Sequence, residues 1–174
     1  MRILAISGSL RTLSTNMELL KAAALMVPEG VEFVIFEGIG QLPHFNPDDE
    51  VGPQSVADYR AQLISADAVL ICSPEYAHGV AGVLKNALDW VVGSGELVEK
   101  PVATINAQPR STHAQASLQE ILTVMSARVI TDASIALLVA GRKLNAAGIV
   151  AEPELANPLR RAISALIRSV LHPA

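Results

Sequence analysis

The sequence predicts an α/β fold in which a parallel sheet forms the middle of three layers. Five apolar runs of strand length alternate with segments of helical period, and this order is typical of a parallel sheet with right-handed crossovers. Of the 174 residues, 51% are apolar and 3% are aromatic, so we expect a full core built from aliphatic side chains. A chain of this length predicts one domain, spanning residues 1–174.

The first half of the chain begins with an apolar run over residues 2–7. This run is apolar on both faces, as parallel strands are, and it predicts the first strand. Residues 16–27 carry apolar side chains at helical spacing and predict a helix. Residues 31–36 are β-branched and aromatic, which favours a second strand. Residues 37–53 are rich in glycine and proline and predict a long loop, after which 55–65 is expected to be helical.

The second half of the chain repeats the alternation. Residues 67–73 and 102–107 are apolar runs that predict the third and fourth strands. Each is followed by a segment of helical period, 80–92 and 112–126. A fifth strand is expected within 128–138, where the pattern does not fix its position.

The chain closes with a helix that begins after Pro153. Its expected buried stripe is Leu159, Ile163, Leu166, Ile167 and Val170. The preceding residues, 141–153, contain glycine and asparagine and predict a loose connection. In parallel sheets of this kind ligands bind beyond the carboxyl ends of the strands. The loops after the first, third and fourth strands are therefore the candidate site.

Composition excludes several classes of partner. The formal net charge is −4 and no basic run occurs, which argues against nucleic-acid or anionic-membrane binding. No apolar stretch reaches the roughly 20 residues that a membrane span needs, and the apolar start is too short for a signal peptide. Cys72 is the single cysteine, so no intrachain disulfide forms, which suits the cytoplasm. No Cys/His cluster has metal-site spacing, so no metal is expected.

The first loop, residues 6–18, crowds hydroxyl groups and one guanidinium between a strand and a helix. A helix start carries about four unpaired N–H groups and a partial positive charge, which makes it an anion site. Short polar side chains and an arginine add donors suited to a phosphate monoester. The candidates are Ser9, Arg11, Ser14, Thr15 and Asn16.

Plain helix capping is the alternative interpretation of the same loop. Thr15 and Glu18 fit a capping box in which Thr15 is the N-cap and Glu18 reaches back. A Glu18 carboxylate beside a bound dianion would repel it, so phosphate binding requires Glu18 to point away. The loop has neither the GxGxxG nor the GxxxxGK[ST] pattern, since Gly8 is its only glycine and it lacks lysine, and this disfavours a nucleoside triphosphate.

The second loop follows the third strand. Pro74 ends that strand, because a residue before proline avoids helical geometry. Glu75 and Tyr76 are then expected at the carboxyl edge of the sheet. Ala77 opens a run of small residues that would let a flat ligand lie close to the backbone. A plain strand-to-helix turn, with glycines chosen for backbone geometry, is the alternative.

Taken together, the two loops resemble the NADPH-dependent FMN reductase family. The segments that carry the resemblance are GSLRTLSTN (8–16), PEYAHGVAGVLKNALDW (74–90) and LPHFNPDDE (42–50). This family of flavodoxin-like proteins includes FMN, quinone, azo and chromate reductases. The resemblance implies a flavodoxin-like three-layer sandwich with a five-stranded parallel sheet. It rests on specific motifs up to about Trp90, and on element order beyond.

The resemblance also implies one FMN per subunit, held without a covalent bond. Its phosphate would lie in the loop from Ser9 to Asn16. The ring would run along Pro74, Glu75, Tyr76 and Ala77. This chain departs from the family at Ala77, where an asparagine is frequent, and in the third loop, which has no glycine in 106–117. In that loop Gln108, Arg110 and Ser111 are the groups that could face the ring.

The implied activity is an FMN-dependent NAD(P)H oxidoreductase, in which the cofactor carries the chemistry. NADPH or NADH would reduce the flavin, and a small acceptor would take the electrons: a flavin, quinone, azo compound or metal oxyanion. We assign no catalytic side chain, and we interpret Glu75 as a structural hydrogen-bond group. The resemblance further implies a homodimer or homotetramer. Helix 80–92 is apolar beyond one stripe, which fits either a subunit face or ordinary core packing with Trp90 exposed.

Two other functions remain open at this point. A flavodoxin-type electron carrier would keep FMN without reacting directly with NAD(P)H. Such carriers tend to be strongly acidic and to cage the flavin with aromatic residues, whereas this chain is mildly acidic and poor in aromatics. A flavin-free module that binds a phosphate ester is the second alternative. The sequence decides neither the acceptor nor NADPH over NADH.

Overall fold

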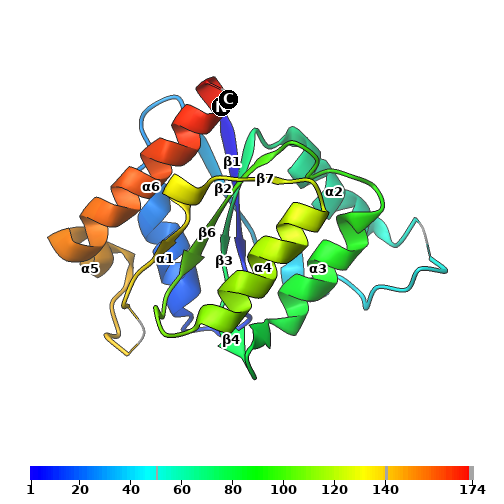
Figure 1. Ribbon diagram of the computed structural model, residues 1–174, viewed down its shortest axis with the longest axis horizontal. Helices are drawn as coiled ribbons and strands as arrows, with labels where there is room; N and C mark the ends of the chain where they lie inside the picture. The colour runs from blue at the N-terminus through cyan, green and yellow to red at the C-terminus, as the bar shows by residue number, and fades with distance from the viewer. Residues whose placement is uncertain (50, 140, 173–174) are drawn as a thin grey trace.

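The central sheet has five strand positions, all parallel (Figure 1). A computed structural model describes residues 1–49, 51–139 and 141–172. Four positions hold full strands, in the order β2 (Glu32–Phe36), β1 (Arg2–Ser7), β3 (Ala68–Cys72) and β6 (Pro101–Asn106). In the sheet Ser7 pairs with Cys72 and Cys72 pairs with Ile105, so these strands end side by side. The three loops expected at the site therefore leave the same edge.

The fifth position is filled by two short pieces. β7 (Arg128–Val129) and β8 (Ile135–Ala136) both pair with β6, and the 3₁₀ turn η2 (Thr131–Ala133) lies between them. Where the strand leaves the sheet, the Ser134 hydroxyl accepts a hydrogen bond from Thr104 N (3.2 Å) and donates one to Ile130 O (3.0 Å). The strand predicted within 128–138 is thus present but interrupted, because a side chain satisfies the backbone at the break.

Helices cover both faces of the sheet and complete the three layers (Figure 1). Ile3 and Ala5 of β1 face one core, with α1 (Thr15–Ala24) and α6 (Pro153–Leu171). Leu4 and Ile6 face the other core. That second core is covered by α2 (Gln54–Ser65), α3 (Gly82–Val92) and α4 (Thr112–Val124). Alternate residues of one strand are buried on opposite sides, which explains why the strands lack a polar face.

Two connections differ from their predicted character. The segment predicted to be loose, 141–153, contains the short helix α5 (Ala146–Ala151), whose N-cap Asn145 accepts a hydrogen bond from Gly148 N. The predicted long loop, 37–53, contains the 3₁₀ turn η1 (Gly38–Gln41). Short helices of this kind carry little periodicity, so tertiary contacts rather than pattern decide them.

Trp90 is a core residue and not an exposed one. It is 2% exposed, its Nε1 donates a hydrogen bond to Pro43 O at 2.8 Å, and Phe45 meets its ring edge-on at 5.2 Å. Val91 and Leu97 are buried in the same core. Trp90 is therefore covered by the chain's own loop, and Trp90, Val91 and Leu97 do not form a free subunit face.

Within residues 1–49, 51–139 and 141–172, no helix is both long enough and apolar enough to cross a bilayer. The same part of the chain holds no group of three or more His, Cys, Asp or Glu side chains placed to bind a metal ion.

Candidate functional site

An open cleft of about 610 Å³ lies beyond the carboxyl ends of β1, β3 and β6. Eight of the nine residues predicted for the site line it, from two loops far apart in sequence. They are Ser9, Arg11, Ser14, Thr15, Asn16, Pro74, Glu75 and Tyr76. The remaining lining residues are Ser73, Asn106, Ala107, Gln108 and Ser111. The ninth predicted residue, Ala77, is not part of the lining.

The first loop turns directly from β1 into α1. Ser14, not Thr15, is the N-cap: its backbone is extended and its Oγ accepts a hydrogen bond from Met17 N at 3.3 Å. Thr15 is the first helical residue. Both residue types cap helices well, so composition alone does not separate adjacent candidates. The N–H groups of Thr15 and Asn16 consequently lie in the first turn, where a helix offers no acceptor of its own.

Glu18 does not reach back to the helix start. Its Oε2 accepts a hydrogen bond from Ala146 N at 2.8 Å and its Oε1 pairs with Lys21 Nζ at 2.9 Å. Partial burial acts to raise the pKa of Glu18, but the hydrogen bonds from Lys21 and Ala146 and the Lys21 charge together hold it below its usual value. The capping box is therefore absent, and the carboxylate points away from the anion position, as phosphate binding requires.

Asn16 is oriented from beneath by the end of β3. The buried Cys72 Sγ donates a hydrogen bond to Asn16 Oδ1 at 3.2 Å, and Asn16 itself is 7% exposed. Because the amide oxygen is occupied by the thiol, its NH₂ group is the end left for the cleft. Sequence reasoning treated Cys72 only as an indicator of a reducing compartment and missed this contact.

The second loop is a β-hairpin and not a plain turn into α3. β4 (Glu75–Tyr76) pairs antiparallel with β5 (Gly79–Val80). The two residues between them, Ala77 and His78, have φ values of 49° and 58°, as in the tight hairpin turns that usually need Asn-Gly. Ala77 is exposed at the tip, which explains its absence from the cleft lining.

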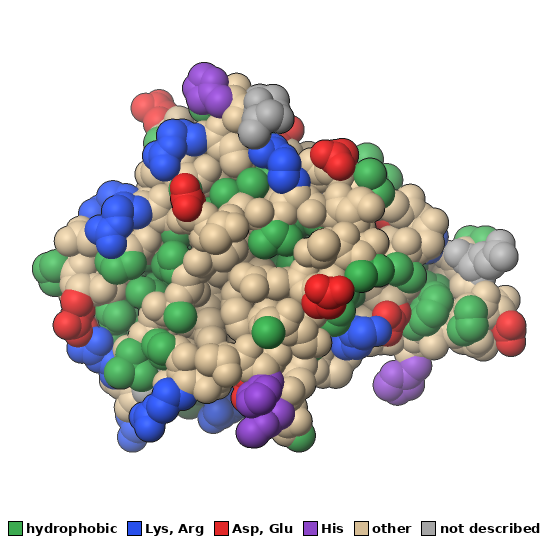
Figure 2. Space-filling model, viewed as in Figure 1, with side chains coloured by type: hydrophobic (Ala, Val, Ile, Leu, Met, Phe, Trp, Pro, Cys, Tyr) green, Lys and Arg blue, Asp and Glu red, His purple; other side chains and the backbone are tan. Residues whose placement is uncertain are grey.

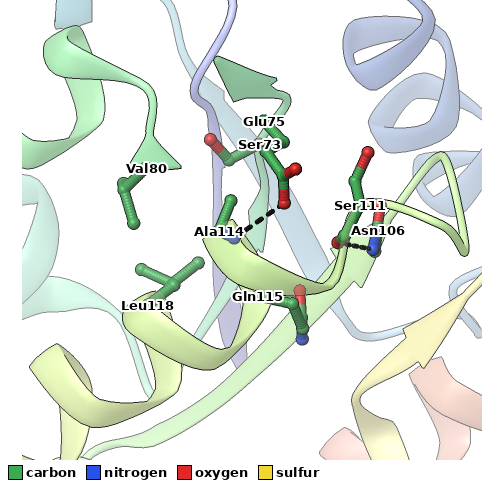
Figure 3. A pocket seen from close by; sticks show the side chains of 8 residues that line it. All are labelled: Ser73, Glu75, Val80, Asn106, Ser111, Ala114, Gln115 and Leu118. Carbon is green, nitrogen blue, oxygen red and sulfur yellow. Dashed lines mark hydrogen bonds between the residues drawn. The ribbon is translucent and has the colours of Figure 1, made fainter. Parts of the chain in front are cut away.

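Glu75 anchors the hairpin to α4. Its Oε2 accepts a hydrogen bond from Ala114 N at 2.8 Å, in the first turn of that helix. Figure 3 shows this bond beside a smaller cavity lined by Val80, Leu118 and Ser73. The contact agrees with the structural interpretation of Glu75. At the hairpin tip, the His78 ring stacks on the His113 ring at 4.4 Å.

The third loop is tied together by Asn106. Its Nδ2 donates to Ser111 O at 2.7 Å, and its Oδ1 accepts from Gln108 N at 2.9 Å (Figure 3 shows the first bond). Gln108 lines the cleft, and its buried Oε1 has no partner among the described residues. Gln108 and Ser111 reach the cleft as the sequence suggested, whereas Arg110 does not line it.

Ser73 and Asn106 are cleft residues that sequence reasoning did not select. A signal for them was available, because they lie at or directly after the carboxyl ends of β3 and β6, where ligands bind in parallel sheets. Polar residues at that edge, next to apolar strands, are the pattern to look for.

A sequence model of the family described as NADPH-dependent FMN reductase matches residues 1–140. The chain belongs to this family. An NAD(P)H-dependent FMN reductase of Pseudomonas aeruginosa is 31% identical over 95% of this chain and 92% of that protein. An NADPH:quinone oxidoreductase of Arabidopsis thaliana is 40% identical over 60% of this chain and 57% of its own length.

Among solved structures, FerB of Paracoccus denitrificans, a flavoenzyme NAD(P)H:(acceptor) oxidoreductase, superposes with a TM-score of 0.85. It is 28% identical, and the match covers 98% of this chain and 97% of that one. The predicted flavodoxin-like α/β sandwich is thereby confirmed. Family membership places the chain among the flavin-dependent NAD(P)H oxidoreductases, with FMN and a nicotinamide nucleotide as cofactors.

Proposed function

We propose that this chain binds FMN in the cleft beyond β1, β3 and β6 and passes electrons from NAD(P)H to a small quinone-type acceptor. The observation that carries the proposal is the convergence of eight predicted residues from two distant loops on one cleft. The phosphate is assigned to the start of α1. The ring is assigned to the space between the second and third loops.

The residues at the start of α1 fit a phosphate ester. The lining there consists of hydroxyl, amide and guanidinium donors from Ser14, Thr15, Asn16 and Arg11. The nearby carboxylate of Glu18 is committed to Lys21 and Ala146 N and does not oppose an anion. A dianion in this position also gains from the positive end of the helix.

The other end of the cleft fits the polar edge of a flavin. Gln108 Oε1 is a buried acceptor without a partner among the described residues, and such a group costs free energy until a donor reaches it. Asn106 fixes the backbone turn that presents Gln108. If the Gln108 side chain turned toward the cleft, an N–H or hydroxyl of a bound ligand would satisfy this oxygen.

The protein residues hold and orient the cofactor, whereas FMN, when bound, accepts the hydride and passes the electrons on. Ser14, Thr15 and Asn16 would bind the phosphate end. The turns at Tyr76 and Gln108 would border the ring, and nicotinamide and acceptor would use the open cleft in turn. No side chain is assigned a proton-transfer role, and Glu75 acts by holding the hairpin on α4.

A quinone is the acceptor class we favour, because several relatives are named as quinone reductases. We also propose that residues 1–174 form a single flavin-binding domain, that the protein works as a homodimer or homotetramer, and that it acts in the cytoplasm. The family resemblance supports the oligomer, and the single buried Cys72 fits the compartment.

Anaerobic mixing of the FMN-loaded protein with NADPH or NADH tests this function. We expect the visible absorbance of the flavin to bleach rapidly, and a quinone such as menadione to restore it. Parallel turnover assays with an azo dye, chromate and free FMN rank the acceptors. A protein that takes up no FMN, or whose flavin stays oxidised in excess NADPH, would contradict the proposal.

A further inference from the structure

A second groove adjoins the flavin cleft and shares Arg11, Ser14 and Thr15 with it. Its volume is about 1190 Å³ with the open solvent at its mouth included, and its other wall comes from the segment 141–145 that leads into α5. The proposed function does not use this groove. Its continuity with the cleft makes it a path along which an elongated ligand could extend past the first loop.

The groove carries two cationic side chains on separate segments. Arg11 belongs to the first loop and Lys143 to the opposing segment, and neither has a carboxylate partner among the described residues. Glu18 also lines the groove, but Lys21 and Ala146 N occupy its two oxygens. Figure 2 shows Lys and Arg side chains along the lower left edge of the molecule, where Figure 1 places this segment.

The residues on either side of Lys143 are held by contacts of their own. Its neighbour Arg142 pairs with Glu152 at 2.6 Å and with Glu154 at 2.7 Å. Two residues further on, Asn145 caps α5 through Gly148 N. Lys143 itself has a φ of 52°, which is uncommon for a lysine. Its side chain is exposed and forms no ion pair among the described residues, so its ammonium is available to an anion.

Apolar side chains lie beside these charges. Leu13 is 86% exposed and Leu144 is partly buried, and both line the groove. An exposed leucine next to paired cations suits a ligand with a flat apolar face and a strongly charged group. A purine nucleoside carrying a phosphate has that combination.

We propose that this groove binds the adenosine end of NADPH, with the 2′-phosphate at Lys143 and with Arg11, which lines both the cleft and the groove, lying between it and the FMN phosphate. The inference rests on the proposed function, because the nicotinamide must lie in the flavin cleft and the remainder of the dinucleotide must leave it. The groove on the other side of Arg11, beside Leu10, Tyr76 and Val83, offers no second cation. Charge therefore selects the Lys143 side, and the enzyme prefers NADPH over NADH.

Steady-state kinetics of Lys143→Gln with both nucleotides test the assignment at a saturating quinone concentration. We expect the KM for NADPH to rise about tenfold, as the loss of one charged contact to phosphate predicts. The KM for NADH, both kcat values and the FMN content should stay as in the wild type. Lys143→Arg should restore most of the NADPH affinity.

Arg161→Gln is the matched control. It removes the same charge from a residue of α6 that does not line the groove. We expect its KM for NADPH to stay within about twofold of wild type. An equal rise in both variants would mean that general surface charge, and not this site, attracts the nucleotide, and would overturn the proposal.

Calorimetry with adenosine 2′,5′-bisphosphate and with 5′-AMP provides a readout independent of turnover. The FMN-loaded wild type should bind the bisphosphate more tightly, and Lys143→Gln should lose most of that preference. An unchanged preference, or equal KM changes for NADPH and NADH, would refute the site while leaving the proposed function standing. Failure of both nucleotides to reduce the flavin would instead refute the proposed function.

Discussion

The first and second loops line the same cleft but are held in different ways. In the first loop most side-chain bonds close within three residues, as Arg11 N to Ser9 Oγ and Met17 N to Ser14 Oγ do, and the exceptions are Asn16 with Cys72 and Glu18 with Ala146 N. The second loop is a hairpin held from outside. Glu75 accepts from Ala114 N, 39 residues away, and His78 stacks on His113.

The first loop is therefore an anion site formed mainly by local bonds, whereas the second loop depends on tertiary contacts. The geometry of the first loop follows from a strand that runs into a capped helix, so its donors are in place before any ligand arrives. The hairpin has only two residues in each strand and contacts α4 for support. We therefore expect substitutions in the first loop to act on phosphate affinity, and substitutions in the second to act on stability and on ring position.

The largest expected effect is that of Ser14→Asp. Aspartate caps a helix as well as serine does, so the unliganded protein should keep its melting temperature. Its carboxylate would face the phosphate, and two unit charges 4 Å apart near a protein surface repel by about 4 kcal/mol. We expect FMN affinity, measured by fluorescence quenching, to fall at least about 100-fold.

Riboflavin is the control ligand for Ser14→Asp, because it lacks the phosphate. Its affinity should change far less than that of FMN. If the variant bound both flavins as the wild type does, Ser14 would serve only as a cap, and the contrast between the loops would disappear.

A smaller effect is expected for Glu75→Ala, which removes the hydrogen bond between the hairpin and α4. Loss of a carboxylate-to-amide hydrogen bond should lower the free energy of unfolding by about 1–2 kcal/mol. FMN affinity should fall only a few fold, because the phosphate loop is untouched. Urea unfolding of Glu75→Ala beside Glu75→Gln, which keeps an acceptor oxygen, checks the origin of the loss. A 100-fold loss of FMN binding would show instead that the hairpin carries affinity.

The smallest effect concerns the backbone of the hairpin tip. Asparagine tolerates the positive φ of Ala77 better than alanine does, so Ala77→Asn should raise the unfolding free energy by about 0.5 kcal/mol. Ala77→Val should lower it by about 1 kcal/mol, because a β-branched side chain is poorly accommodated there. Thermal melts of the two variants would show opposite shifts. Equal shifts would mean that the tip relaxes out of this conformation.

The sequence predicted those parts of the fold that depend on local pattern. β1, β3 and β6 were recognised because both of their faces are apolar. The sequence did not show that Ser14, and not Thr15, is the N-cap, since neighbouring hydroxyl residues have similar capping strength. At the fifth strand, the Ser134 hydroxyl takes the place of a backbone partner in the sheet. The apolar pattern of a strand does not reveal such a replacement.

The parts of the site that escaped prediction depend on contacts between distant residues. Glu18 meets Ala146 N across 128 positions of sequence, which stabilises α5 and frees the start of α1 at once. Trp90 is buried because Pro43 and Phe45 cover it. Local periodicity contains no information on either pairing, so only the folded chain reveals them.

The buried thiol of Cys72 has a consequence for a protein that handles reducing equivalents. Burial raises the pKa of this thiol, so it stays protonated, and a protonated thiol reacts poorly with peroxides and alkylating agents. The single cysteine is thus shielded from oxidants formed nearby while the fold is closed. Its modification rate reports how often the interior opens.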